Sequence, residues 1–86
     1  FVPIEQATIS IKTNAFLYGT SLFEGIRGYY LPDDNTVNIF RLREHFERLL
    51  QNSRMFYLTP PQTLDDCCEI TAELIRRNAP RSDVYI

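Results

Sequence analysis

The amino-acid sequence predicts one small α+β domain of two layers, with a short sheet beside two helices. Two β-rich segments, 27–31 and 36–41, flank the turn-forming run 32–35 (Pro-Asp-Asp-Asn), which predicts a hairpin. Two amphipathic helices follow, and a further β-rich segment begins at residue 83. Strands followed by helices and another strand are typical of the α+β and α/β classes.

The segment before the hairpin is predicted to start as a strand and then to bend. Residues 7–11 alternate small or polar residues with apolar ones, so Ile9 and Ile11 would share one face of a strand. Residues 15–27 gather small and aromatic side chains, but two glycines interrupt them. We therefore expect a turn and a short helical piece there rather than a long helix.

The two helices are predicted from apolar stripes and from a capping signal. Residues 42–54 carry apolar side chains at the spacing of one helical face, namely Leu42, Phe46, Leu49 and Leu50. A second helix is expected from Thr63 to about residue 78, because Thr63 and Asp66 resemble a capping box. Its inward face would consist of Leu64, Cys67 or Cys68, Thr71, Leu74 and Ile75.

Composition excludes several classes of function. The 86 residues suffice for one small, marginally stable domain, and a net charge of −2 argues against a nucleic-acid partner. No apolar run reaches the length that a membrane span needs, and the N-terminus shows no signal-peptide pattern. Cys67, Cys68 and the single histidine, His45, offer no metal-site spacing. Two thiols without a disulfide framework favour a reducing, cytoplasmic setting.

The stretch from Tyr18 to Tyr29 carries most of the functional information. It reads Tyr-Gly-Thr-Ser-Leu-Phe-Glu-Gly-Ile-Arg-Gly-Tyr and places glycines around an aromatic-lined bend. Glycines let a backbone or a ligand approach closely, and aromatic rings with polar tips can wall a pocket for an apolar side chain. The pattern by itself favours a different interpretation, in which the same residues form a tight turn of the core.

This stretch closely resembles the signature of branched-chain aminotransferases, which are fold-type-IV pyridoxal-phosphate enzymes. Residues 40–49 resemble the start of the family's next helix, and residues 84–86 (Val-Tyr-Ile) resemble a strand that in the family continues into an arginine and a proline. The resemblance covers nearly the whole chain, in the family's order and spacing. Residues 19–21 (Gly-Thr-Ser) favour the branched-chain subgroup, because D-amino-acid aminotransferases and aminodeoxychorismate lyases tend to carry Gly-Asp-Gly there.

The resemblance implies roles for four residues. Arg48 matches the arginine that holds the phosphate of pyridoxal 5'-phosphate, a task that suits a guanidinium because it binds phosphate bidentately and stays charged. The alternative for Arg48 is a solvated helix residue paired with Glu44. Phe23 and Tyr18 match walls of the substrate side-chain pocket, with Tyr18 offered across a dimer interface. Tyr85 matches a tyrosine that helps to hold the substrate carboxylate, although all three aromatic residues could equally pack in the core.

The sequence offers no lysine in the position that the family's chemistry requires. The only lysine, Lys12, follows the first predicted strand, whereas the family's catalytic lysine lies far downstream in a second domain. The chain also starts without a methionine. Residues 1–86 are therefore expected to be a small N-terminal domain truncated at both ends, without the large domain, without a catalytic residue and inactive alone.

For the parent protein, the resemblance implies a homo-oligomer that moves the amino group of leucine, isoleucine or valine to 2-oxoglutarate and yields the branched 2-oxo acid. Two alternatives stay open. One is another class-IV aminotransferase or an aminodeoxychorismate lyase, which a substrate screen would separate. The other is a non-catalytic interaction module, which would cover its own core, whereas a piece of a larger enzyme would expose apolar surface.

Overall fold

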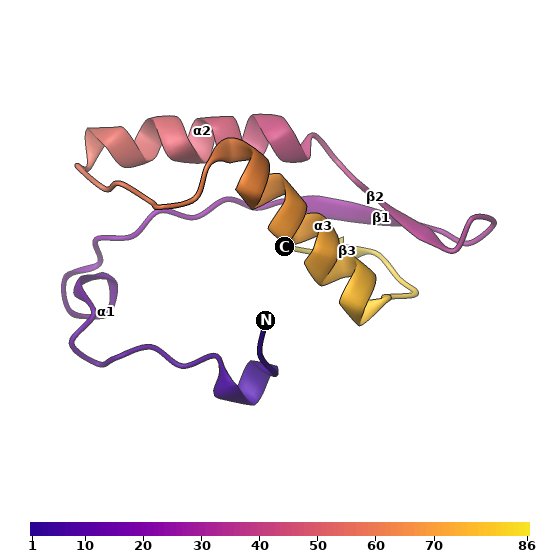
Figure 1. The fold of residues 1–86 in the computed structure, drawn as a ribbon, viewed down its shortest axis with the longest axis horizontal. Helices are drawn as coiled ribbons and strands as arrows, with labels where there is room; N and C mark the ends of the chain where they lie inside the picture. The colour runs from indigo at the N-terminus through magenta and orange to yellow at the C-terminus, as the bar shows by residue number, and fades with distance from the viewer.

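A three-stranded antiparallel sheet lies beside two long helices in the computed structural model, which describes residues 1–86 (Figure 1). β1 (Arg27–Leu31) is the middle strand, between β2 (Thr36–Ile39) and β3 (Val84–Tyr85). α2 (Leu42–Met55) and α3 (Leu64–Asn78) connect β2 to β3 and contact each other. The α+β class that the sequence predicts is confirmed.

The hairpin forms where the sequence predicts it, with residues 32–35 as the turn between β1 and β2. The register pairs Gly28 with Ile39, in an antiparallel ladder. Asn35 has a φ of 50°, a left-handed conformation that asparagine adopts more readily than most residues. Its side-chain oxygen accepts a hydrogen bond of 3.0 Å from the Tyr30 hydroxyl, which fixes the turn to the strand before it.

Close packing at the centre of the sheet requires glycine at position 28. A methyl group there would lie 2.7 Å from Val84 Cγ2 and 2.8 Å from Val37 Cγ1, too close for carbon atoms. Nearby, Ile26 is 3% exposed and forms the buried apolar centre of the chain. Ile26 and Ile86 exchange two backbone hydrogen bonds of 3.1 and 2.8 Å, so the pairing of β1 with β3 extends one residue beyond the strands.

Both predicted helices are present, and α3 begins with the predicted capping box. The Thr63 hydroxyl accepts a hydrogen bond of 3.1 Å from the Asp66 backbone N–H, and the Asp66 carboxylate accepts one of 2.8 Å from the Thr63 N–H. At the other end, Arg76 and Arg77 both pair with Glu73. These cations lie in the last turn, where the helix dipole favours positive charge.

The amino-terminal part departs from the prediction. The strand predicted over residues 7–11 is wrong: Ile9 and Ile11 are 73% and 76% exposed, and no strand pairs with them. Alternation produces a strand only where a neighbouring edge accepts its hydrogen bonds. The short helical piece is confirmed as α1 (Asn14–Tyr18), which ends at Gly19 with a φ of 68°.

One helix position also differs from the prediction. Leu74 was expected to face inward from α3, but it is 41% exposed, because the neighbouring elements leave that side of the helix open. Thr71, predicted on the same face, is buried at 6% exposure. Its hydroxyl donates a hydrogen bond of 2.9 Å to the Cys67 carbonyl, so the buried hydroxyl has a hydrogen-bond partner.

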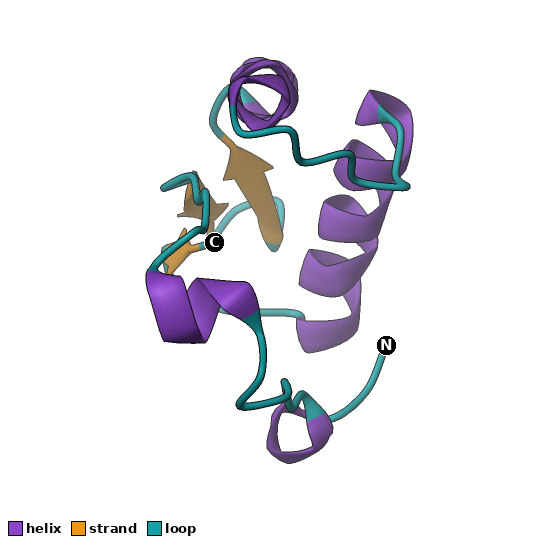
Figure 2. Cartoon of the chain, turned by 90° about the vertical axis from the view of Figure 1, so that its left-hand side faces the viewer, coloured by secondary structure: helices purple, strands orange, loops and turns teal.

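The chain leaves much of its surface open. Its solvent-accessible surface is 7156 Å², whereas a compact protein of its mass exposes about 5,300 Å². Its radius of gyration is 14.7 Å, against about 12 Å for a compact domain of this length. η1 (Ile4–Gln6) lies below the sheet (Figure 2), and α1 lies to one side of it (Figure 1). The Phe1 ring lies 4.3 Å from the Arg77 guanidinium of α3. None of the helices has the length and apolar character needed to cross a membrane.

Candidate functional site

A carboxylate in the segment before β1 is bound by two basic side chains of α2. Glu24 Oε1 accepts a hydrogen bond of 2.7 Å from Arg48 Nε, and Glu24 Oε2 accepts one of 2.5 Å from Arg48 Nη2. His45 Nδ1 lies 2.9 Å from the same Oε2. The Glu24 side chain is only 8% exposed. These three residues, the Glu24 cluster, tie the segment before β1 to the helix.

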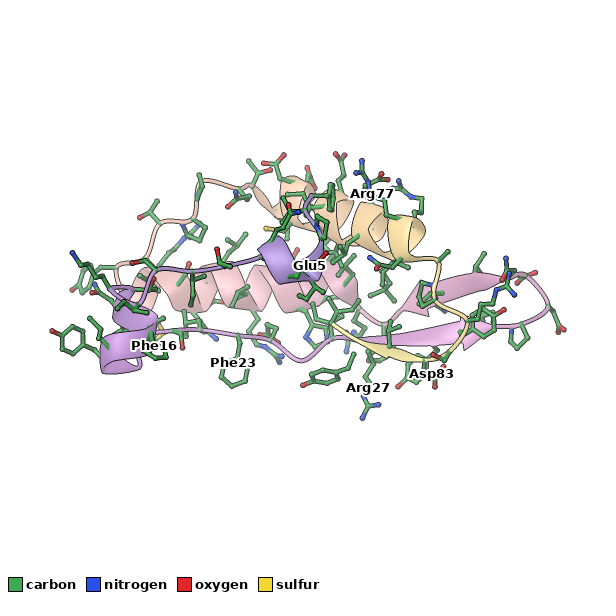
Figure 3. All side chains as sticks on the ribbon, turned by 90° about the horizontal axis from the view of Figure 1, so that it is seen from below. Glu5, Phe16, Phe23, Arg27, Arg77 and Asp83 are labelled. Carbon is green, nitrogen blue, oxygen red and sulfur yellow. The ribbon has the colours of Figure 1, made fainter.

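Strand-like alternation explains why Glu24 turns inward. The less exposed positions of residues 22–28 are Leu22, Glu24, Ile26 and Gly28, apart from the small Gly25. Phe23 and Arg27 are exposed and project to the same side of the ribbon (Figure 3). This is the period of an extended chain, in which successive side chains alternate between faces. His45 and Arg48 are three residues apart, so they are neighbours on the face of α2 that meets Glu24.

Hydrogen bonding keeps Glu24 and Arg48 charged. The bonds from Arg48 and then from His45 lower the pKa of Glu24 to about 2, although burial acts in the opposite direction. The Glu24 carboxylate in turn raises the pKa of Arg48. The carboxylate and the guanidinium therefore remain ionised through the physiological pH range.

Arg48 keeps part of its side chain free. It is 61% exposed and lines a groove of about 300 Å³, whose other lining residues are Phe40, Arg41, Glu44 and His45. Glu44 binds Arg41 at 3.1 Å instead of Arg48, so the pairing of Arg48 with Glu44 does not form. Glu24 takes two of the five N–H donors of the Arg48 guanidinium, Nη2 also lies 3.4 Å from His45 Nδ1, and the two N–H groups of Nη1 have no partner.

The chemistry of the groove fits a phosphate. Its two guanidiniums, Arg41 and Arg48, outnumber its one carboxylate, Glu44. Free guanidinium N–H groups at one edge form the fork that binds phosphate oxygens bidentately. Metal ions have no comparable site, because the chain contains no group of three or more His, Cys, Asp or Glu side chains able to hold one.

Tyr85 lies against two residues of the neighbouring segment, Gly25 before β1 and Arg27 at its start. A methyl group on Gly25 would overlap the Tyr85 hydroxyl, so the ring can lie there only because residue 25 is glycine. The Arg27 guanidinium lies 5.6 Å from the centre of the Tyr85 ring, within the range of a cation–π contact. Tyr85 nevertheless stays 70% exposed.

None of the three aromatic residues singled out from the sequence packs in the core. Phe23 is 88% exposed, Tyr18 is 75% exposed and Tyr85 is 70% exposed. Tyr18 ends α1, apart from the sheet and from α2 (Figure 1). The chain therefore brings Glu24 and Arg48 together but does not join the aromatic residues to them.

Glu24 is the residue that the sequence analysis did not single out. A signal existed, because a carboxylate stands between Leu22 and Ile26 on the inward face of an alternating segment. Such a group needs a cation or hydrogen-bond donors. His45, the single histidine, lies within hydrogen-bond distance of the same carboxylate.

No family model matches the chain. The "Probable branched-chain-amino-acid aminotransferase" of Aquifex aeolicus is 45% identical over 85 residues, which are 99% of this chain and 27% of that protein. The chain is a homologue of the branched-chain-amino-acid aminotransferases.

Solved structures of branched-chain aminotransferases contain the same fold. The enzyme of Thermoproteus uzoniensis, crystallised with norvaline, matches with a TM-score of 0.89 and 33% identity over 98% of this chain and 28% of that one. The enzyme of Thermobaculum terrenum in PLP-form matches with a TM-score of 0.86 and 37% identity over 98% of this chain and 27% of that one. The chain thus spans little more than a quarter of the length of these aminotransferases.

Proposed function

We propose that the chain is the small N-terminal domain of a pyridoxal-phosphate-dependent branched-chain aminotransferase. The parent protein transfers the amino group of leucine, isoleucine or valine to 2-oxoglutarate. The observation that supports this is the exposed Arg48 guanidinium, held on one edge by Glu24 and lining a groove that it shares with Arg41. When bound, the cofactor supplies the electron sink for the chemistry, and the protein supplies binding and orientation.

Each proposed contact uses a residue that the chain leaves exposed. Arg48 binds the cofactor phosphate. Phe23 walls the substrate side-chain pocket, and Tyr18 of a second copy completes that wall. Tyr85, held by Gly25 and Arg27, directs its hydroxyl to the substrate carboxylate. No residue of the chain is proposed to be catalytic, and Lys12 does not match the lysine that carries the cofactor.

The open surface supports a larger assembly. The chain exposes about 1,900 Å² more than a compact protein of its mass. One side of a standard protein interface covers about 800 Å², so a large domain and a second subunit would together account for this excess. A self-sufficient interaction module would cover its own apolar residues, and this chain does not. The free thiols of Cys67 and Cys68 suit a cytoplasmic enzyme.

A search for the cofactor-bearing lysine tests the proposal. We expect borohydride reduction of the full-length protein, followed by digestion and mass spectrometry, to find a pyridoxyl-lysine outside residues 1–86. The 86-residue chain treated in the same way should carry no such label. A cofactor-saturated full-length sample without a labelled lysine would contradict the proposal.

Substitution of Arg48 tests the phosphate contact. In the full-length protein, Arg48→Ala should weaken pyridoxal phosphate binding roughly 100-fold, because two charge-assisted hydrogen bonds are lost. Arg54→Ala removes a guanidinium from the same helix without breaking an ion pair, and should change binding less than about twofold. Amino-group transfer from leucine, isoleucine and valine, compared with D-alanine and aminodeoxychorismate, separates the proposed activity from the other class-IV reactions.

A further inference from the structure

The Glu24 cluster differs from every other ion pair of the chain. Its carboxylate is 8% exposed, whereas the acidic partners of the remaining pairs are between 32% and 74% exposed. It is also the one pair that joins the segment before β1 to α2, across 24 positions of the sequence. Exposed pairs contribute little to stability, but a carboxylate removed from solvent and bonded through both oxygens has a fixed position.

The geometry leaves the guanidinium of Arg48 with one edge held and one edge free. Nε and one Nη2 hydrogen are bound to Glu24. Nη2 also lies 3.4 Å from His45 Nδ1, whereas the two hydrogens of Nη1 have no partner, so the free edge of the planar group is that of Nη1. Because Arg48 is 61% exposed and lines the groove, this edge belongs to the part of the side chain that a ligand can reach.

We propose that Glu24 is the positioning residue of the phosphate site: it holds one edge of the Arg48 guanidinium so that the other edge is presented to the phosphate. The proposal rests on the proposed function and assigns to Glu24 a role toward the same group. Glu24 acts only through Arg48, with His45 fixing the Oε2 atom of the carboxylate.

Pre-orientation is useful because an arginine side chain is long and flexible. A free Arg48 would lose rotamer freedom each time that a phosphate binds, whereas a held Arg48 has lost it during folding. The lowered pKa of Glu24 means that the holding carboxylate stays charged wherever the enzyme works. The arrangement resembles the partners that orient metal-binding side chains, whose removal typically weakens binding 10- to 100-fold.

Two other roles would fit the same contacts and give different results. If Glu24 only fastened the segment before β1 to α2, its loss would weaken the binding of every ligand alike. If Glu24 competed with the phosphate for Arg48, its loss would strengthen phosphate binding. Only a positioning role predicts a loss that is specific to the phosphate and depends on Arg48.

The experiment measures binding of pyridoxal phosphate and of pyridoxal, which lacks the phosphate, to full-length Glu24→Gln. We expect about tenfold weaker binding of pyridoxal phosphate, less than twofold change for pyridoxal, and a shifted phosphorus-31 resonance of the bound phosphate. In an Arg48→Ala background, Glu24→Gln should have no further effect. The matched control is Glu73→Gln, which removes a carboxylate that binds two arginines on α3 and should leave both affinities unchanged.

Each outcome decides between the roles. An equal loss for both ligands, unchanged or tighter binding of pyridoxal phosphate, or a full effect in the Arg48→Ala background would overturn the positioning role. Wild-type protein that binds neither ligand would refute the proposed function itself, which keeps the two failures distinct. Should Glu24→Gln fail to fold, Glu24→Asp decides instead: it keeps the charge but withdraws the carboxylate, and must lower the affinity for pyridoxal phosphate relative to pyridoxal.

Discussion

Residues 1–23 and residues 24–86 differ in how many stabilising contacts they make within the chain. In residues 24–86, strands pair, α3 is capped and α2 contacts α3. In residues 1–23, the two short helices have no side-chain cap, and apolar side chains such as Phe16 stay 70% exposed. Glu24, at the boundary, is the first side chain bonded to α2. On the proposed function, we expect residues 1–23 to complete their packing against the rest of the parent protein.

The largest loss of stability that this comparison predicts comes from a substitution at the centre of the sheet. Gly28→Ala places a methyl group against Val37 and Val84, and should lower the free energy of unfolding of the 86-residue chain by about 2–3 kcal/mol. The midpoint of urea unfolding, followed by circular dichroism, measures this loss.

The matched substitution in the other region is Gly19→Ala. It meets no atom within 4 Å, but it strains a residue with a φ of 68° by about 1 kcal/mol. Because α1 contacts little else, we expect that strain to fray α1 and to change global unfolding by less than about 0.5 kcal/mol. Equal losses for Gly19→Ala and Gly28→Ala would contradict the division of the chain into two regions.

The next largest effect is the pH dependence of the stability that Glu24 contributes to the fold. The pKa of Glu24 is about 2 in the folded chain and has an ordinary value of 4.5. A depressed carboxyl pKa stabilises the folded state above the unfolded pKa, and this contribution disappears as pH falls from about 4.5 to 2. We expect its size to be about 1–2 kcal/mol, since Arg48 is partly exposed to solvent.

Comparison of the wild-type chain with Glu24→Gln isolates this contribution, because the other carboxylates titrate in both. The difference in unfolding free energy should be largest near pH 6 and should vanish near pH 2. A difference that stays constant between those pH values would show that the Glu24 charge does not stabilise the fold.

A smaller effect is expected at the start of α3. Thr63→Ala removes the hydroxyl that accepts the Asp66 N–H, and should cost about 1 kcal/mol. Hydrogen exchange should accelerate most in the first turn of the helix. Thr59→Ala, in the connection before α3, removes a hydroxyl that makes no hydrogen bond and should change stability by less than about 0.3 kcal/mol. A similar loss for Thr59→Ala would mean that the cap is not the cause.

The contrast between the two regions also explains which features the sequence could predict. The hairpin turn at residues 32–35 and the capping box at Thr63 depend on residues a few positions apart, so both were predictable. A strand over residues 7–11 depends on a partner edge, which local alternation does not reveal. The bond between Glu24 and Arg48 spans 24 positions, so the sequence suggested Arg48 only through the resemblance and left Glu24 unassigned.

The smallest effect on the free energy of unfolding is predicted in residues 1–23, where side chains make the fewest contacts within the chain. Ile9→Ser changes a side chain that is 73% exposed, so the free energy of unfolding of the 86-residue chain should change by less than about 0.5 kcal/mol, while binding of a hydrophobic dye decreases. In the full-length protein the same change should cost about 1.5–3 kcal/mol, the value of burying an isoleucine, if a partner surface covers this segment. Ile26→Ser serves as the control, because Ile26 is 3% exposed and should be costly in both proteins. If Ile9→Ser were equally harmless in the full-length protein, residues 1–23 would be open in the assembly too, and the difference between the two regions would be a property of the chain rather than of a missing partner.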